Sequence, residues 1–183
     1  MKTPFMVALA MSSLPCAVMA QNQHHNEINE VIISASPLQE GSAGIKQSVS
    51  VLSGENLRNK AAATIGDTLK DELGVTNQGF GPGVGKPVIR GQSDNRVRVL
   101  QDGLGTMDAS TVSGDHAITT EALLAERIEI LRGPATLRYG SGAIGGVVNV
   151  IDNRIPDKVP EKLEGAVEYR HNTASDQDST VFK

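Results

Sequence analysis

A strand is the first element that the order of apolar and polar residues predicts. Along residues 47–53, Val49 and Val51 alternate with serines, and a period of two residues is the spacing of a strand. Four further strands are predicted where short apolar runs lie between glycines and polar turns. These runs cover residues 87–90, 96–100, 128–131 and 146–151.

A short helix is predicted after the first strand. Thr64, followed three residues later by Asp67, resembles a capping box, in which a side chain at the start of a helix binds an unpaired backbone amide. Gly74 is expected to end the helix. The apolar residues that form its predicted buried face, spaced four apart, are Ile65, Leu69 and Leu73.

Loops are predicted between these elements. Residues 79–85 are rich in glycine and show no helix or strand pattern. Asp102-Gly103 predicts a tight turn, and residues 105–119 form a long polar segment. A short helix is expected over residues 120–125, and one helical turn over residues 133–138.

The first twenty residues have the order of a secretory signal. Lys2 supplies a positive charge, residues 5–11 are apolar or small, and Val18-Met19-Ala20 provides a cleavage site. The mature chain is therefore expected to begin at Gln21. The alternative, a buried N-terminal helix, is disfavoured because the segment shows no amphipathic period. The apolar run is too short for a permanent membrane-spanning helix.

Cys16 is the chain's one cysteine, and it lies within the predicted signal. Ser13 and Pro15 stand where a lipoprotein signal needs leucine and a small residue, so lipidation is not expected. Cleavage after Ala20 leaves a mature chain without disulfides or thiolate metal ligands.

Composition narrows the class of protein. A formal net charge of -4 argues against an electrostatic nucleic-acid binder. An aromatic content of 3% without tryptophan is too low for a complete outer-membrane barrel, which carries aromatic girdles at both interfaces. The chain is thus expected to contain at most the start of a barrel and to be a fragment.

A glycine motif in the chain suggests a dinucleotide site, but the order of the elements around the motif argues against such a site. Residues 140–145 satisfy G-x-G-x-x-G, which in a Rossmann fold follows a strand and opens a helix. Here the order is reversed, because a helical turn precedes the glycines and an apolar strand follows them. The glycines are instead expected to allow a close approach of backbone segments.

The run from Glu126 to Gly140, continuing into Ser141 to Asn149, resembles the C-terminal signature of the plug domain of TonB-dependent outer-membrane receptors. Three further stretches resemble earlier plug elements in the same order: residues 48–75, Val88-Ile89-Arg90-Gly91 and the segment Arg96 to Gly103. The resemblance implies an α+β fold, with a small mixed sheet and short helices. The first strand or strands of an incomplete transmembrane β-barrel are then expected to follow.

The resemblance also implies a division of the chain. Residues 1–20 are the signal peptide, residues 21–44 a flexible tail, residues 45–153 the plug, and residues 154–183 a linker with the start of the barrel. The tail is polar, and His24 and His25 are best explained as solvated residues rather than metal ligands. In the barrel segment, apolar side chains alternate outward from residue 163 to Tyr169.

Partners follow from the same resemblance. A β-prone segment of the tail lies where such receptors carry the TonB box, which pairs as an added strand with the energy-coupling protein TonB; alternatively it is the first strand of the domain. Its residues are Glu30, Val31, Ile32, Ile33, Ser34 and Ala35.

Arg90 and Arg132 match plug arginines that pair with glutamates of the barrel wall; alternatively they form surface salt bridges.

Cargo is indicated by the polar segment. Asp108-Ala109-Ser110 and Gly114-Asp115-His116-Ala117 resemble the loop of zinc-uptake receptors in this family. The resemblance implies that Asp115 and His116 contribute to a zinc site that barrel residues complete, since carboxylate and imidazole both bind zinc. Zinc is expected as the transported ligand, with no resident cofactor.

The resulting hypothesis is a non-catalytic receptor plug in the outer membrane of a Gram-negative cell, facing the periplasm and the barrel lumen. Its expected partners are TonB, the outer membrane, and a metal ion or metal chelate, with no nucleic acid. The first alternative keeps the receptor but changes the cargo to an iron chelate (siderophore) or haem. Two further alternatives are a plug-only binding module and a soluble dinucleotide-binding protein.

Overall fold

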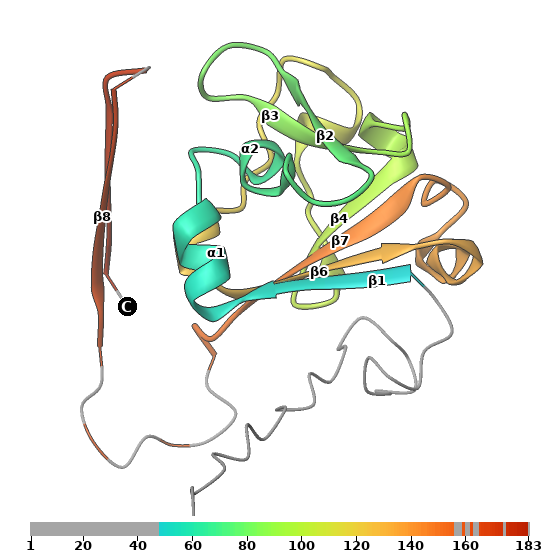
Figure 1. Cartoon of the computed structure of the whole chain (residues 1–183). Helices are drawn as coiled ribbons and strands as arrows, with labels where there is room; N and C mark the ends of the chain where they lie inside the picture. The colour runs from blue at the N-terminus through green and yellow to red at the C-terminus, as the bar shows by residue number, and fades with distance from the viewer. Residues whose placement is uncertain (1–47, 156–158, 160–161, 163–164, 174, 183) are drawn as a thin grey trace, which may run out of the picture.

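A five-stranded mixed sheet forms the centre of the chain in the computed structural model, which describes residues 48–155, 159, 162, 165–173 and 175–182 (Figure 1). The strand order is β1-β6-β7-β4-β5, with β4 and β7 parallel and the other neighbours antiparallel. The strands are β1 (Ser48–Ser53), β4 (Val97–Gln101), β5 (Leu104–Gly105), β6 (Ala125–Arg132) and β7 (Gly146–Asp152).

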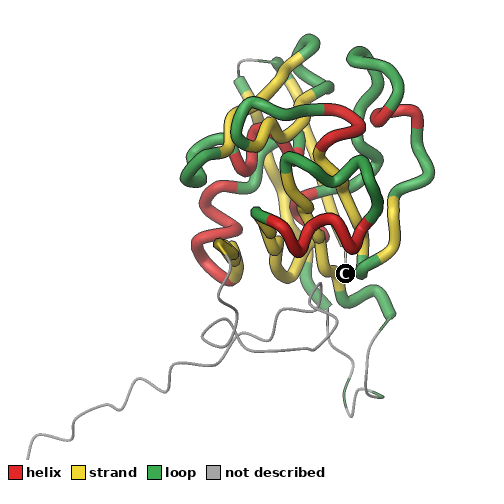
Figure 2. Tube along the Cα trace, turned by 90° about the vertical axis from the view of Figure 1, so that its right-hand side faces the viewer, coloured by secondary structure: helices red, strands yellow, loops and turns green. Residues whose placement is uncertain are grey.

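Two separate hairpins and several short helices complete the described fold, which is α+β as predicted. Figure 2 shows the short helices and long loops around the strands of the sheet. The hairpin strands are β2 (Val75–Gly79), β3 (Gly85–Ile89), β8 (Val167–Asn172) and β9 (Gln177–Phe182). The helices are α1 (Gly54–Lys60) and α2 (Ile65–Leu69), with the 3-10 turns η1 (Asp94–Arg96), η2 (Ala109–Thr111), η3 (Ala122–Leu124) and η4 (Pro134–Tyr139).

Both faces of the central sheet carry apolar side chains. On one face, strand residues such as Ile128 and Val148 pack with Leu57 of α1 and Leu69 of α2, and both helices lie on the same side of the sheet (Figure 1). The opposite face carries a smaller cluster, made of Leu100, Leu131, Ala143 and Val147. This double covering explains why most residues of the inner strands β6 and β7 are buried and apolar, with Glu129 and Asn149 as buried exceptions.

The predicted helix forms, but it is shorter than expected. The Thr64 hydroxyl accepts a hydrogen bond from the Asp67 amide over 3.1 Å and caps α2. The helix ends at Leu69, where the chain turns, so the prediction for Leu73 was wrong: its side chain is 88% exposed. Among the described residues, no helix has the length and apolar character needed to cross a membrane.

The sequence analysis missed α1 and β2, and also the short elements β5, η1 and η2. Helix α1 buries Leu57 alone, so it leaves no apolar period. Strand β2 buries only Val75, and the glycine-rich stretch interpreted as loop contributes its two ends to the β2–β3 hairpin. Arg90 was expected in a strand, but β3 ends one residue earlier and Arg90 adopts a φ of 51°.

The glycines at residues 140–145 follow η4 and lead directly into β7, so the arrangement is the reverse of a dinucleotide-binding loop. Their role is close backbone approach, as predicted. A Cβ atom on Gly142 would lie 2.5 Å from the carbonyl oxygen of Asn95, and one on Gly145 would lie 2.6 Å from Cβ of Gln92. The segment therefore presses against the η1 region, where a side chain has no room.

The β8–β9 hairpin stands beside α1, apart from the central sheet (Figure 1). The expected alternation is present from Val167 onward: Val167 and Tyr169 are exposed, and Glu168 and Arg170 are partly buried. Residues 163 and 164, where the alternating segment was expected to begin, lie outside the described residues, as do the predicted signal and tail of residues 1–44.

Candidate functional site

The loop of residues 106–119 is closed at its base by one carboxylate. Asp108 accepts hydrogen bonds from the Ser110 amide (3.0 Å), the Thr119 amide (3.2 Å) and the Thr119 hydroxyl (3.1 Å), and also from the Ser110 hydroxyl. Partial burial alone raises the pKa of Asp108, but these hydrogen bonds outweigh it and lower the pKa below its ordinary value. The loop is thus held in a defined shape although most of it is exposed.

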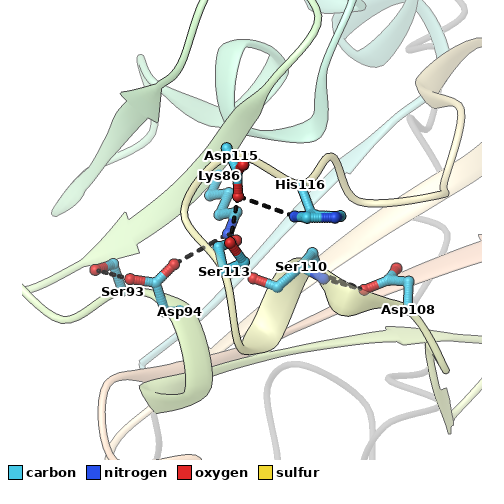
Figure 3. A network of polar contacts seen from close by, with 8 residues as sticks. All are labelled: Lys86, Ser93, Asp94, Asp108, Ser110, Ser113, Asp115 and His116. Carbon is cyan, nitrogen blue, oxygen red and sulfur yellow. Dashed lines mark hydrogen bonds and ion pairs between the residues drawn. The ribbon is translucent and has the colours of Figure 1, made fainter.

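Asp115 and His116 lie on this loop, side by side and half exposed (Figure 3). Nδ1 of His116 is 2.9 Å from Oδ1 of Asp115, and the Ser113 hydroxyl donates to the same oxygen. The hydrogen bond from Ser113, and then the one with His116, lower the pKa of Asp115. Because an ionised carboxylate can only accept, a neutral His116 ring that makes this hydrogen bond carries its proton on Nδ1 and presents a lone pair at Nε2.

The pair cannot hold a bare metal ion by itself. Among the described residues, no group of three or more histidine, cysteine, aspartate or glutamate side chains is placed to bind a metal. Zinc in a protein needs four ligands, or three with a water or substrate molecule. Asp115 and His116 can therefore serve only as part of a site whose other ligands come from elsewhere or from the cargo itself.

Lys86 reaches this loop from β3, a contact that the sequence analysis did not foresee. Its side chain is 3% exposed, and Nζ donates to the Ser110 carbonyl (2.5 Å), the Ser113 carbonyl (2.5 Å) and the Asp94 carboxylate (3.1 Å). These three bonds use all three donors of the ammonium group. The lysine thus fixes the middle of the loop that carries the candidate ligands (Figure 3).

The two predicted wall-contact arginines lie near one another on the helix-bearing face of the sheet. Arg132 is 4% exposed and donates from Nη1 to the Ser50 hydroxyl over 2.8 Å. Burial, and then the positive charge of Arg90, lower the pKa of Arg132. Arg90 is exposed, and its backbone amide donates to the Gly74 carbonyl. Whether both meet carboxylates of a barrel wall stays a prediction.

A second buried charge lies on the opposite face. Glu129 is fully buried in β6 and accepts from Nε of Arg127 (3.1 Å) and from Nδ2 of Asn149 (3.3 Å). Asn149 in turn accepts from the Gly103 amide over 2.9 Å. This network ties the turn after β4 to β6 and β7. The acid inside the apolar run Ile128-Glu129-Ile130 was the sequence signal that could have revealed it.

A cleft of about 340 Å³ separates the hairpin from the domain, lined by α1, η3, β6 and Glu168. The hairpin contacts the domain through Arg170, whose Nη1 donates to the Ala62 carbonyl (2.7 Å) and to Oε1 of Glu121 (3.2 Å). The polar side of the hairpin thus faces the domain. The TonB-box-like segment Glu30–Ala35 lies outside the described residues.

A family model described as TonB-dependent Receptor Plug Domain matches residues 42–147. This chain belongs to the TonB-dependent receptor plug family. The plug's relatives include the vitamin B12 transporter BtuB of Vibrio vulnificus (strain CMCP6), which is 32% identical over 166 residues, 88% of this chain and 26% of that protein. The chain therefore spans about a quarter of the length of this relative.

Other relatives of the plug are also receptors. The hemin receptor of Yersinia pestis is 30% identical over 141 residues, 76% of this chain and 21% of that protein. The crystal structure of the siderophore receptor PirA from Acinetobacter baumannii matches with a TM-score of 0.52 and 30% identity, covering 66% of this chain and 19% of that one. These names do not support the predicted closeness to zinc receptors.

Proposed function

We propose that this plug belongs to an outer-membrane receptor that binds a metal-containing cargo and is energised by TonB. The observation that carries the proposal is an exposed carboxylate–imidazole pair, Asp115 and His116, on a loop fixed from the core of a TonB-dependent plug. The relatives named above are transporters and receptors, and the proposed role is likewise binding and transport without catalysis.

The first candidate cargo is an iron chelate or haem. Relatives whose names mention haemin and siderophores support it. The geometry supports it as well, because a chelate brings most of its own metal ligands. A plug that presents one imidazole nitrogen, oriented by a carboxylate, then needs to supply only the position that remains.

Zinc itself is the second candidate, and the chemistry of Asp115 and His116 favours it. Both residue types are common zinc ligands, and a carboxylate that binds Nδ1 orients a histidine whose Nε2 binds the metal. In this case the receptor has to supply the further ligands from its barrel. The plug alone is then expected to bind zinc weakly.

The remaining parts of the chain fit this role as proposals. Residues 1–20 direct export, and residues 21–44 form the tail, in which residues 30–35 pair with TonB. Residues 45–153 are the plug, and residues 154–183 lead into the wall. The β8–β9 hairpin suits a first wall segment, because Val167, Tyr169 and Phe182 share its exposed side while Arg170 faces the plug.

Uptake by the complete receptor in a Gram-negative host tests the proposal. We expect cells to accumulate ⁵⁵Fe supplied as haemin or as a ferric siderophore, only when TonB is present, and we expect His116→Ala to reduce this uptake. His171→Ala, which changes a histidine on the hairpin, is the matched control. Uptake of ⁶⁵Zn²⁺ instead of iron establishes the second candidate, and TonB-independent accumulation of all three probes contradicts the proposal.

A further inference from the structure

The Lys86 ammonium group is a buried cation that joins two parts of the plug far apart in the sequence. Lys86 belongs to β3, whereas the carbonyls that it binds belong to residues 24 and 27 positions later. The neighbouring Asp94, which adopts a φ of 53°, supplies the compensating negative charge. Ser110, one of the two residues bound through their carbonyls, is itself buried.

Ser113 connects this buried cation to the exposed pair. Its carbonyl accepts from Lys86, and its hydroxyl donates to Oδ1 of Asp115, which also meets Nδ1 of His116. Figure 3 shows these four residues in one continuous network. A displacement of Ser113 therefore moves the carboxylate that holds the imidazole ring.

We propose that Lys86 is the positioning residue of the Asp115–His116 pair. It acts through Ser113 and keeps the proton of His116 on Nδ1 and the lone pair of Nε2 directed outward. The inference rests on the proposed function for its biological purpose, but the geometry that it assigns can be tested without any cargo. Residues that orient a metal ligand from behind set both its tautomer and its direction.

The chemistry of the site argues for a specific role rather than filling of the core. An ammonium group is costly to bury, and an apolar side chain of similar volume commonly fills such a position at least as well. The side chain of Lys86 extends from β3 to the loop. Apolar residues lie beside it, namely Pro87, Val97, Val99 and Ile118. What the cation provides here is a simultaneous hold on two backbone carbonyls, those of Ser110 and Ser113. The Ser113 carbonyl also accepts from the His116 amide over 3.4 Å, which ties the same point of the loop directly to the candidate ligand.

Nitrogen NMR of the histidine rings, recorded on the receptor containing this plug at alkaline pH, tests the inference. At that pH histidine rings are neutral, so the ring shifts report the tautomer. We expect His116 to be protonated at Nδ1 in the natural protein and to shift toward a mixture of tautomers in Lys86→Met. Lys70→Met, which removes an exposed lysine, should leave the ring unchanged. An unchanged His116 ring in Lys86→Met overturns the proposal.

Ser113→Ala provides a second variant that leaves the buried cation in place. It removes the hydroxyl that binds Asp115 and should shift the His116 ring in the same direction. Lys86→Met is judged unfolded if amide protection in β6 and β7 is lost. In that case the His116 ring shifts of Ser113→Ala alone test the proposal. An unchanged ring in Ser113→Ala overturns the proposed path through Ser113.

A double-mutant cycle separates positioning from a general structural effect. With haemin and Zn²⁺ as separate probes, Lys86→Met should weaken binding about tenfold for the probe that the plug binds, the lower end of the effect of outer-shell partners. Combined with Asp115→Ala, it should weaken binding no further, because the two act through one path. Additive effects overturn the positioning role. If His116→Ala leaves the affinity for both haemin and Zn²⁺ unchanged, the result contradicts the proposed function instead.

Discussion

Arg132 donates one hydrogen bond to Ser50, with 2.8 Å between Nη1 and the hydroxyl oxygen. Its Nε and Nη2 are buried and meet no acceptor among the residues that the structure describes. A buried guanidinium without a hydrogen-bonded acid is unfavourable, and burial and the charge of Arg90 outweigh the favourable charge of Glu72 in lowering the pKa of Arg132. The arrangement is therefore incomplete within the plug and suits a carboxylate supplied by the proposed wall.

Replacing Arg132 by methionine should have opposite effects in two settings. In this chain alone, the change should leave the free energy of unfolding unaltered or raise it by about 1–4 kcal/mol, because a buried charge that has only Glu72 as a nearby acid is removed. In the complete receptor, it should lower stability by roughly 3–5 kcal/mol, because the partner carboxylate loses its cation. Denaturant unfolding of both proteins measures the difference. Arg90→Met, at an exposed position, is the control, and a large destabilisation of the chain alone contradicts the prediction.

The 106–119 loop should loosen in acid because of Asp108. Its carboxylate has a lowered pKa in the folded chain, so its contribution to stability is complete above the ordinary value of 3.8 and is lost as the pH falls through the lower folded-state pKa. Hydrogen exchange of the Thr119 amide, followed from neutral pH downward, should show protection decreasing in that window. In Asp108→Asn, protection should be lower at neutral pH and nearly independent of pH. Unaltered protection in the variant contradicts the assignment.

The contact between the hairpin and the plug should depend on Arg170. Its bonds to the Ala62 carbonyl and to Glu121 join the hairpin to the plug. Hydrogen bonds that involve a charged group contribute about 1.5–3 kcal/mol. Arg170→Ala should therefore speed hydrogen exchange in β8 and β9 while leaving β6 and β7 protected. Arg170→Lys should lie between the two, since a lysine reaches one partner at a time. Equal protection in all three proteins contradicts the prediction.

Gly66 should not tolerate a methyl group. A Cβ atom there would lie 2.6 Å from the backbone nitrogen of Lys86 and closer still to Oδ1 of Asn77, so α2 and β3 would have to separate. Gly66→Ala should lower the free energy of unfolding by about 1–3 kcal/mol, the usual cost of overpacking. Gly83 lies at the tip of the β2–β3 hairpin with open space around it, so Gly83→Ala should change the free energy of unfolding little. Thermal unfolding of both variants provides the comparison.

Strands β1, β4, β6 and β7 of the central sheet could be predicted because each contributes an apolar pattern, whereas the two exposed residues of β5 contribute none. The inner parts of β6 and β7 are buried on both faces, and residues 128–131 and 146–151 are therefore apolar except at Glu129 and Asn149. Helix α1 and strand β2 could not be predicted, since each places a single residue in the core. The same limit explains Leu73: its spacing fitted the helix, but the helix ends four residues earlier and no packing partner remains.

The residues of the candidate site also differ in whether the sequence could predict them. Asp115 and His116 could be found from their loop, because that stretch resembles part of a known family. Lys86 could not, since its partners lie 24 and 27 positions away and a lysine in a short strand gives no local sign of burial. Glu129 is intermediate, because a carboxylate within an apolar strand signals an internal partner without saying which residue it is.

The order of strands in the sheet also sets the order in which the domain can fold. The β2–β3 hairpin closes over a short turn, and such local contacts form early. Strand β1 lies at the sheet edge and pairs with β6, which comes near the opposite end of the domain. Pairings between residues so far apart form slowly, because a long intervening chain must first be closed. Strand β1, the first strand among the described residues to be synthesised, is thus expected to be the last to pair. A chaperone-binding assay on unfolded chains should find residues 48–53 accessible for longest.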